Sequence, residues 1–271
     1  MTEDAITEKL RRRSRLIGDD CAVIPSPGGR DLLLKADLSI EGVHFTRDRG
    51  AEAIGERAVA RSLSDIAAMG GTPSYCLISI ALAPWTDQRW IDSFYNGIYT
   101  ILRKSKAELA GGDISHAKCL MCDVMFCGYV AKGQALLRSG AKTGDVIYVS
   151  GALGGWRHKA MITPRLKFGR ELVGRATACM DISDGLALDL HRLCKASGVA
   201  AELDNIPLLN DATLKQALHD GEDYELLFTA SPRKKVPGIR IGRIVEGRKG
   251  EVRYGGQVVK PIGYDHTRQN H

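Results

Sequence analysis

The chain has few aromatic residues and no apolar run long enough to cross a bilayer. Only 6% of its 271 residues are Phe, Trp or Tyr, and no stacking motif for nucleic acid is visible. The longest apolar run, Leu77–Ala83, is too short for a membrane span. We therefore expect no membrane partner and no nucleic-acid partner. Because the chain opens with the polar residues Met-Thr-Glu-Asp rather than a signal peptide, we expect a cytoplasmic protein.

Motifs that commonly bind nucleotide phosphates are also missing. The sequence contains no Gly-x-x-x-x-Gly-Lys-Ser/Thr loop. The protein-kinase signatures His-Arg-Asp and Asp-Phe-Gly are absent, as is the Gly-x-Ser-x-Gly nucleophile elbow. Any nucleotide site must therefore rest on metal ions and glycine turns.

Cysteine and basic residues are present in patterns that favour structural roles. The seven cysteines are an odd, scattered set, which indicates no disulfide framework. Cys119 and Cys122 have zinc-like spacing, but no second pair or histidine lies at a matching distance, so buried thiols on a strand are the better interpretation. Part of the net charge of +6 lies near the start, at Lys9, Arg11, Arg12, Arg13 and Arg15. A solvated helix or arm is favoured there over a nucleic-acid-binding segment.

A predicted helix from Ala51 to the glycine pair Gly70-Gly71 is the stretch around which the chain is organised. One stripe of this helix is apolar. The stripe that carries Asp65 is built from small residues, namely Ala58, Ser62 and Ala68. A second surface is expected to pack there, where an unpaired carboxylate is costly. Taken alone, Asp65 is more simply a solvated or capping residue.

Alternation and turn signals predict both strands and helices, with a domain boundary near residues 137–142. The expected domains are 1–138 and 139–271. Strands are predicted at 31–37, 74–82, 119–130, 145–150, 199–203, 239–245 and 252–259, and further helices at 85–106, 164–173, 186–198 and 212–218.

Six aspartates share a context of glycine or small residues at a predicted strand end, turn or helix terminus. They are Asp20, Asp37, Asp65, Asp113, Asp181 and Asp184. One of the last two could cap the following helix, but two exceed what capping needs. If the six converge, their repulsion requires cations. Hard oxygen ligands in this number favour Mg²⁺, which usually also holds substrate phosphates.

Taken in order, these motifs carry a resemblance. They are Gly18-Asp-Asp, Asp37 with Glu41-Gly-Val-His-Phe, Leu63-Ser-Asp-Ile-Ala-Ala-Met-Gly, Gly111-Gly-Asp, Arg138-Ser-Gly-Ala-Lys-x-Gly-Asp, Asp181-Ile-Ser-Asp-Gly-Leu and Gly221-Glu-Asp-Tyr-Glu-Leu. The ordered set, with the closing Gly263-Tyr-Asp-His, resembles the thiamine-monophosphate kinase family.

The resemblance implies a two-domain α+β fold of the aminoimidazole ribonucleotide synthetase type, with an N-terminal ATP- and Mg²⁺-binding domain that dimerises through its sheet and a C-terminal α/β domain. It implies a homodimer that uses ATP and Mg²⁺ to convert thiamine monophosphate to thiamine diphosphate. The six aspartates above would bind Mg²⁺. Gly112, Asp113, Arg138 and Ser183 would contact ATP, and His44, Glu222 and Tyr264 would contact thiamine phosphate.

The chain departs from the family pattern at three places. Lys35-Ala36 stands where hydroxyl residues usually precede Asp37, so possible metal-contacting oxygens are lost and a cation is added. Asp220 replaces the first glycine of Gly-Gly-Glu-Asp, and the stretch between Gly155 and Asp181 is shorter. A divergent nucleotide-binding protein without catalysis and another ATP-dependent enzyme of the same superfamily therefore stay open as alternatives.

Overall fold

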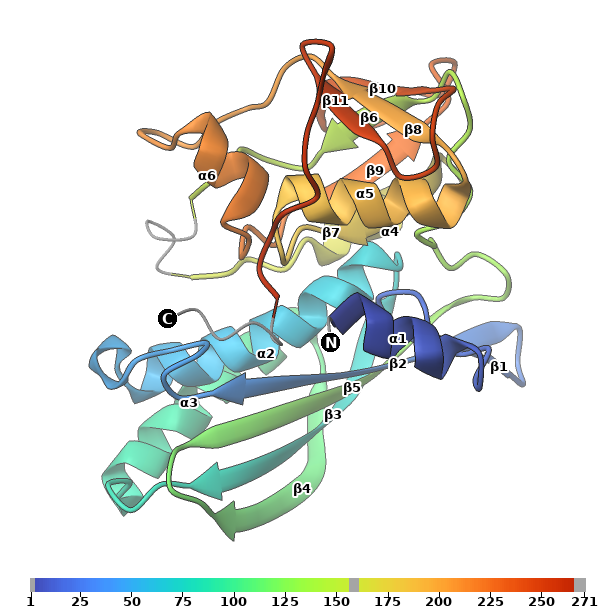
Figure 1. The fold of residues 1–271 in the computed structure, drawn as a ribbon. Helices are drawn as coiled ribbons and strands as arrows, with labels where there is room; N and C mark the ends of the chain where they lie inside the picture. Colours follow the sequence, from blue (N-terminus) through green and yellow to red (C-terminus); the bar gives the residue numbers. More distant parts are fainter. Residues whose placement is uncertain (1–2, 156–160, 266–271) are drawn as a thin grey trace.

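Two sheets, formed by separate parts of the chain, lie on opposite sides of one long helix (Figure 1). The structure is a computed structural model that describes residues 3–155 and 161–265. His266, which closes the last predicted motif, and part of the shortened stretch after Gly155 lie outside the described residues. The described helices are α1 (Glu3–Arg11), the short 3₁₀ helix η1 (Arg47–Arg49), α2 (Ala51–Ala68), α3 (Gln88–Ser105), α4 (Leu166–Leu172), α5 (Leu186–Ser197) and α6 (Leu214–His219).

The first sheet has five strands in the order β1-β2-β5-β3-β4. Their bounds are β1 (Ala22–Ser26), β2 (Arg30–Ile40), β3 (Thr72–Leu82), β4 (Glu108–His116) and β5 (Met121–Ala131). β2 and β5 pair antiparallel over their whole length, while β3 and β4 are parallel and are joined through α3. Long strands in fixed register place polar side chains at defined points along the sheet.

The helices α2 and α3 cover one face of this sheet, and alternating residues on the other face remain open (Figure 1). Leu33, Val124 and Phe126 point to the covered face and are fully buried. On the open face, Leu38 and Tyr75 are 45% and 46% exposed. Side chains along each strand alternate between the covered and the open face, as expected for a sheet packed on one side.

The second sheet has seven strands in the order β12-β11-β8-β10-β6-β9-β7. Their bounds are β6 (Val146–Val149), β7 (Ala176–Asp181), β8 (Ala200–Leu203), β9 (Leu226–Ala230), β10 (Ile239–Val245), β11 (Val252–Tyr254) and β12 (Gln257–Val258). Its core joins strand residues such as Ile147 and Leu227 to Leu190 and Leu193 of α5. The α+β fold expected from the sequence is confirmed, and the exact boundary after residue 138 stays a prediction.

The helix α2 is buried on every side over its C-terminal half. All residues from Arg57 to Ala68 are buried. One side packs on the first sheet, and Ala67 and Ala68 pack instead with Leu172 of α4 and Phe228 of β9. A second packing surface is therefore present as predicted, but only in part on the predicted stripe. It is formed by Ala60, Ser64, Ala67 and Ala68, because Ala58 and Ser62 of that stripe pack on the first sheet.

Several predicted bounds were wrong in informative ways. The pair Gly111-Gly112 lies inside β4 and not in a turn, and β2 continues to Ile40, three residues beyond Asp37. The helix α3 begins three residues after Trp85 because Asp87 caps it, accepting a 2.7 Å hydrogen bond from the backbone N–H of Trp90. None of the helices in the described ranges is both long and apolar enough to cross a membrane.

Candidate functional site

A cavity of about 430 Å³ lies between α2, β2 and the loops that follow β7 and α6. Nine predicted site residues line it: Asp37, His44, Asp65, Arg138, Asp181, Ser183, Asp184, Glu222 and Tyr264. The two sheets contribute to the same cavity. Tyr264 reaches it because the last described residues run from the second sheet back toward α2 (Figure 1), where the Tyr264 N–H donates to the carbonyl of Asp184 at 3.0 Å.

Three aspartates form the innermost part of the site, and we call them the carboxylate centre: Asp20, Asp65 and Asp181. One oxygen of each lies within 4.8 Å of the others. Asp20 precedes β1, Asp65 lies in the last turn of α2 and Asp181 ends β7. Their exposed fractions are 4%, 6% and 3%. The interpretation of Asp65 as a solvated or capping residue is therefore wrong.

Each carboxylate of the centre has one partner. Arg138 donates to Asp20 Oδ1 at 2.5 Å, and the Ser64 hydroxyl donates to Asp181 Oδ2 at 2.5 Å. Lys35 Nζ donates to Asp65 Oδ1 at 2.8 Å. The second oxygen of Asp20 is buried and has no hydrogen-bond partner within the described part of the chain. Such an orphaned buried oxygen is a group that a bound cation would satisfy.

Burial makes the centre costly to ionise without a cation. It raises the pKa of Asp65 well above the usual value. Burial, together with the neighbouring charge of Asp20, raises the pKa of Asp181 to about 7. The acidic donors, their spacing and the orphaned oxygen fit a hard divalent ion such as Mg²⁺.

Two loops position the rest of the site by bonding to each other. The Glu222 N–H donates to the Ser183 carbonyl at 2.7 Å, and the Tyr224 N–H donates to the Ile182 carbonyl at 2.8 Å. Gly221 permits this approach, since its φ is +72° and an added Cβ would lie 2.6 Å from the Ser183 carbonyl oxygen. Sequence reasoning predicted the loop residues but not their pairing.

Asp189 of α5 is a site residue that sequence reasoning missed. Its Oδ2 accepts hydrogen bonds from the backbone N–H groups of Ser183, Asp184 and Gly185 at 3.1, 3.0 and 3.2 Å. The proposed capping by Asp181 or Asp184 is wrong, because the cap position is Gly185 and no side chain caps there. Burial and the charge of Asp184 raise the pKa of Asp189 to about 8. An aspartate within the apolar stretch Leu186-Ala-Leu-Asp-Leu was the available signal.

Arginines on α2 and α5 were also missed. Arg61 donates to the Tyr224 hydroxyl at 2.9 Å and to the Ser39 hydroxyl at 3.1 Å. Arg57, one helical turn earlier, pairs with Glu222 at 2.7 Å. The sequence signal for these contacts was a pair of arginines four residues apart on a helix that consists mainly of small and apolar residues.

Arg192 of α5 forms ion pairs with three carboxylates at the cavity wall. It pairs with Asp184, with Asp189 at 3.1 Å and with Asp4 of α1 at 3.1 Å. Arg61, Arg138, Arg192 and Lys35 thus all line the cavity that holds the acidic groups. Such an arrangement can hold divalent cations and phosphate oxygens side by side.

Comparisons with known proteins identify the family. Residues 18–130 match the family model "AIR synthase related protein, N-terminal domain". The thiamine-monophosphate kinase of Aquifex aeolicus is 33% identical over an alignment that covers 95% of this chain and 95% of its own. The chain belongs to the thiamine-monophosphate kinase family. The Salmonella typhimurium thiamine-monophosphate kinase is 35% identical over 80% of this chain and 78% of its own.

A solved structure agrees with this assignment. AaThiL complexed with AMPPCP and TMP superimposes with a TM-score of 0.91 at 31% identity, over 98% of this chain and 97% of its own. The similarity therefore includes both sheets. The expected fold of this family is confirmed over the described residues.

Three residues predicted for this family's site do not line the cavity: Asp20, which is buried in the carboxylate centre, and Gly112 and Asp113. Gly112 and Asp113 lie in β4, the edge strand of the first sheet. Asp113 is paired with Ser79 of the parallel strand β3, so both side chains point to the same, open face of the sheet. Asp113 stands in mid-strand and not at the predicted strand end or turn, so it does not reach the other five aspartates within one chain.

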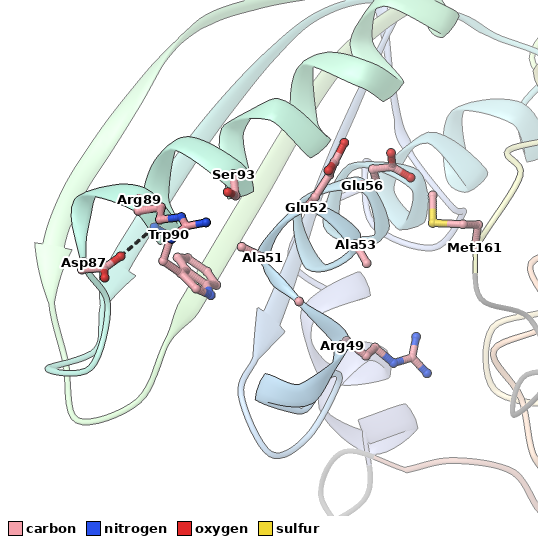
Figure 2. A pocket seen from close by; sticks show the side chains of 11 residues that line it. Arg49, Ala51, Glu52, Ala53, Glu56, Asp87, Arg89, Trp90, Ser93 and Met161 are labelled. Atoms are coloured by element: carbon pink, nitrogen blue, oxygen red, sulfur yellow. Dashed lines mark hydrogen bonds between the residues drawn. The ribbon is translucent and has the colours of Figure 1, made fainter.

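A second cavity, of about 640 Å³, opens between the N-terminal ends of α2 and α3 (Figure 2). Acidic and basic side chains line it, among them Arg49, Glu52, Asp87 and Arg89. Asp87 already caps α3 there. Among the described residues, the three acidic groups close enough to share a metal ion are those of the carboxylate centre, so the first cavity is the candidate site.

Proposed function

We propose that this member of the thiamine-monophosphate kinase family transfers the terminal phosphoryl group of ATP to thiamine monophosphate, giving ADP and thiamine diphosphate. The observation that carries the proposal is the cavity in which the carboxylate centre faces Lys35, Arg61, Arg138 and Arg192. It is supported by the similarity to AaThiL complexed with AMPPCP and TMP. We further propose that the protein acts in the cytoplasm.

The residue roles follow the arrangement of the cavity. Asp20, Asp37, Asp65, Asp181 and Asp184 are proposed to hold Mg²⁺. Arg138 and Ser183 are proposed to contact ATP, and His44, Glu222 and Tyr264 to contact thiamine monophosphate. Bound Mg²⁺ would neutralise phosphate charge and favour an in-line geometry for transfer.

The protein's own groups have an electrostatic rather than an acid–base task. The attacking group is a phosphate oxygen that is already anionic at neutral pH, so no general base is required. Arg61 and Arg192 line the cavity and offer positive charge to phosphate oxygens. Asp189 fixes the loop that carries Ser183 and Asp184, which preserves their positions without substrate contact.

We also propose a homodimer formed through the open face of the first sheet. Leu38 and Tyr75 on this face are 45% and 46% exposed, and large apolar residues exposed on one surface favour a protein partner. Asp113 points to this same face. The predicted roles of Gly112 and Asp113 therefore require a second copy of the chain.

A product assay tests the function. Purified protein is incubated with ATP, Mg²⁺ and thiamine monophosphate, and thiamine diphosphate is separated by chromatography. We expect product only when all four components are present. ATP binding without product would instead favour a nucleotide-binding protein without catalysis.

The substitution Asp65→Asn tests the proposed metal role, because it removes charge and keeps shape. We expect turnover at limiting Mg²⁺ to fall by about a hundredfold or more, since a lost charged contact in such a site costs a few kcal/mol. Asp204→Asn is the matched control, because Asp204 pairs with Arg240 at the surface. Wild-type turnover in Asp65→Asn would exclude the metal role of this residue.

A further inference from the structure

Lys35 enters the carboxylate centre from the covered face of β2. Leu33, Lys35 and Asp37 alternate along the strand and face α2 together. Leu33 fills the core, and the next two positions along the same face reach the cavity. Lys35 Nζ lies 2.8 Å from Asp65 Oδ1 and 3.8 Å from Asp37 Oδ1. The ammonium group therefore stands between two carboxylates.

The surrounding contacts divide the site into two sides. On one side, Asp20 and Asp181 have partners through single oxygens, and Asp20 Oδ2 is left without a hydrogen bond within the described residues. On the other side, Asp37 and Asp65 share Lys35. The first side has an oxygen that still needs a cation. The second side already has a cation, which is the ammonium group of Lys35.

A lysine in this place differs from a metal ion in two ways. Its stem fixes it to β2, so it cannot dissociate when free metal is scarce. It carries one charge and three donor hydrogens on a compact head group. Because like charges only a few ångströms apart repel strongly in a buried setting, the ammonium group disfavours a divalent ion between Asp37 and Asp65.

We propose that Lys35 is a built-in cation of this site, which occupies the space between Asp37 and Asp65 and limits the nucleotide-free protein to one divalent ion, held by Asp20, Asp65 and Asp181. The inference rests on the metal role assigned under the proposed function. It concerns a property of this chain's own Lys35, and it gives the site a cation that is present without metal.

Counting bound ions tests the inference directly. The full chain is titrated with Mn²⁺ without nucleotide, and free Mn²⁺ is followed by electron paramagnetic resonance. Ions of the site are those that Asp65→Asn abolishes, because Asp65 borders both places. We expect one such ion per wild-type chain and about two in Lys35→Met, which removes the charge and adds no ligand. Lys35→Arg, which keeps the charge, should still bind one.

Thermal unfolding provides a second measurement. In EDTA, Lys35→Met should unfold several degrees below the wild type, because Asp65 loses its ion pair. Mn²⁺ should raise the Tm of Lys35→Met by more than it raises that of the wild type.

Equal ion counts in the wild type and Lys35→Met would overturn the inference. If Lys35→Met does not fold, the wild-type count alone decides, and two site ions per wild-type chain would overturn it. The ions are counted without ATP or thiamine monophosphate, so the count does not depend on the proposed reaction. A failed product assay would reject that reaction and leave the ion count unchanged.

Discussion

Asp181 shows at the scale of one residue why the site needs a cation. Its carboxylate is almost fully buried beside Asp20, and the Ser64 hydroxyl is the hydrogen-bond donor to its Oδ2. The desolvation free energy of a buried charge with so few partners exceeds the stabilisation that its hydrogen bond contributes. The site therefore gives up stability for a place where a cation is bound firmly.

This cost predicts a pH dependence for the metal-free protein. The pKa of Asp181 is raised by burial and by Asp20 from 3.8 to about 7. Between these values the folded protein binds more protons than the unfolded chain, so the free energy of unfolding falls as the pH rises from about 4 to about 7. In EDTA at pH 8, Asp181→Asn should be more stable than the wild type, by up to about 4 kcal/mol.

Denaturant unfolding at pH 5 and pH 8 in EDTA measures this difference. Mg²⁺ should stabilise the wild type at pH 8 and leave Asp181→Asn nearly unchanged. Parallel pH profiles for the two proteins would show that Asp181 ionises freely and that its burial carries no such cost.

At the scale of elements, the site depends on the close approach of the loops after β7 and α6. Their backbone hydrogen bonds hold Ser183 and Glu222 next to each other. Glu222 and Tyr224 adopt positive φ values of 54° and 50°. This backbone conformation is energetically unfavourable for residues other than glycine, and here the surrounding hydrogen bonds stabilise it.

Gly221→Ala should destabilise the contact between these two loops. The loss of stability should exceed the backbone strain of a positive φ, because the added Cβ would also clash with the Ser183 carbonyl. Gly174→Ala is a matched control, because its φ is +71° against +72° for Gly221 and a Cβ there meets nothing within 4 Å. We expect Gly174→Ala to cost about 1 kcal/mol of stability, as left-handed alanine does, and to keep full turnover. Gly221→Ala should cost about 2–4 kcal/mol and should lower turnover. Equal effects in both variants, measured by urea unfolding and the product assay, would show that loop contact is unimportant.

At the scale of the whole molecule, the first sheet has one face covered by helices and one face open. The cavity lies on the helix side, whereas Asp113 points to the open side. One chain therefore cannot bring Asp113 to its own carboxylate centre along this sheet. A homodimer is the arrangement in which both the apolar face and Asp113 would find partners.

Subunit mixing tests this arrangement. Asp113→Asn and Asp181→Asn are each expected to be inactive alone. If the site is shared between copies, an equal mixture after subunit exchange should recover about a quarter of wild-type activity, because half the dimers are mixed and one of their two sites is intact. Light scattering during chromatography should show a dimer for all three samples. No recovery in mixed dimers would place Asp113 outside the site of the partner.

The sequence by itself determined the features that depend on local order along the chain. The limits of α2 follow from helical periodicity and the Gly70-Gly71 stop. The small residues beside Asp65 predicted a second packing surface but not which residues form it. The family follows from motifs in a fixed order, which needs no knowledge of distances. The inclusion of Asp20, Asp65 and Asp181 among six candidate metal ligands rested on their local context and on the same ordered motifs.

Only the tertiary structure decided which of these residues meet. Lys35 reaches Asp65 because strand alternation and the packing of β2 on α2 put both at one end of a shared face. Asp189 and Arg192 matter through loops and helices that fold back on them, and Asp113 is excluded by its register with Ser79. Such contacts depend on pairing between distant segments, and the energies that fix this pairing are summed over the whole core rather than written in any local pattern.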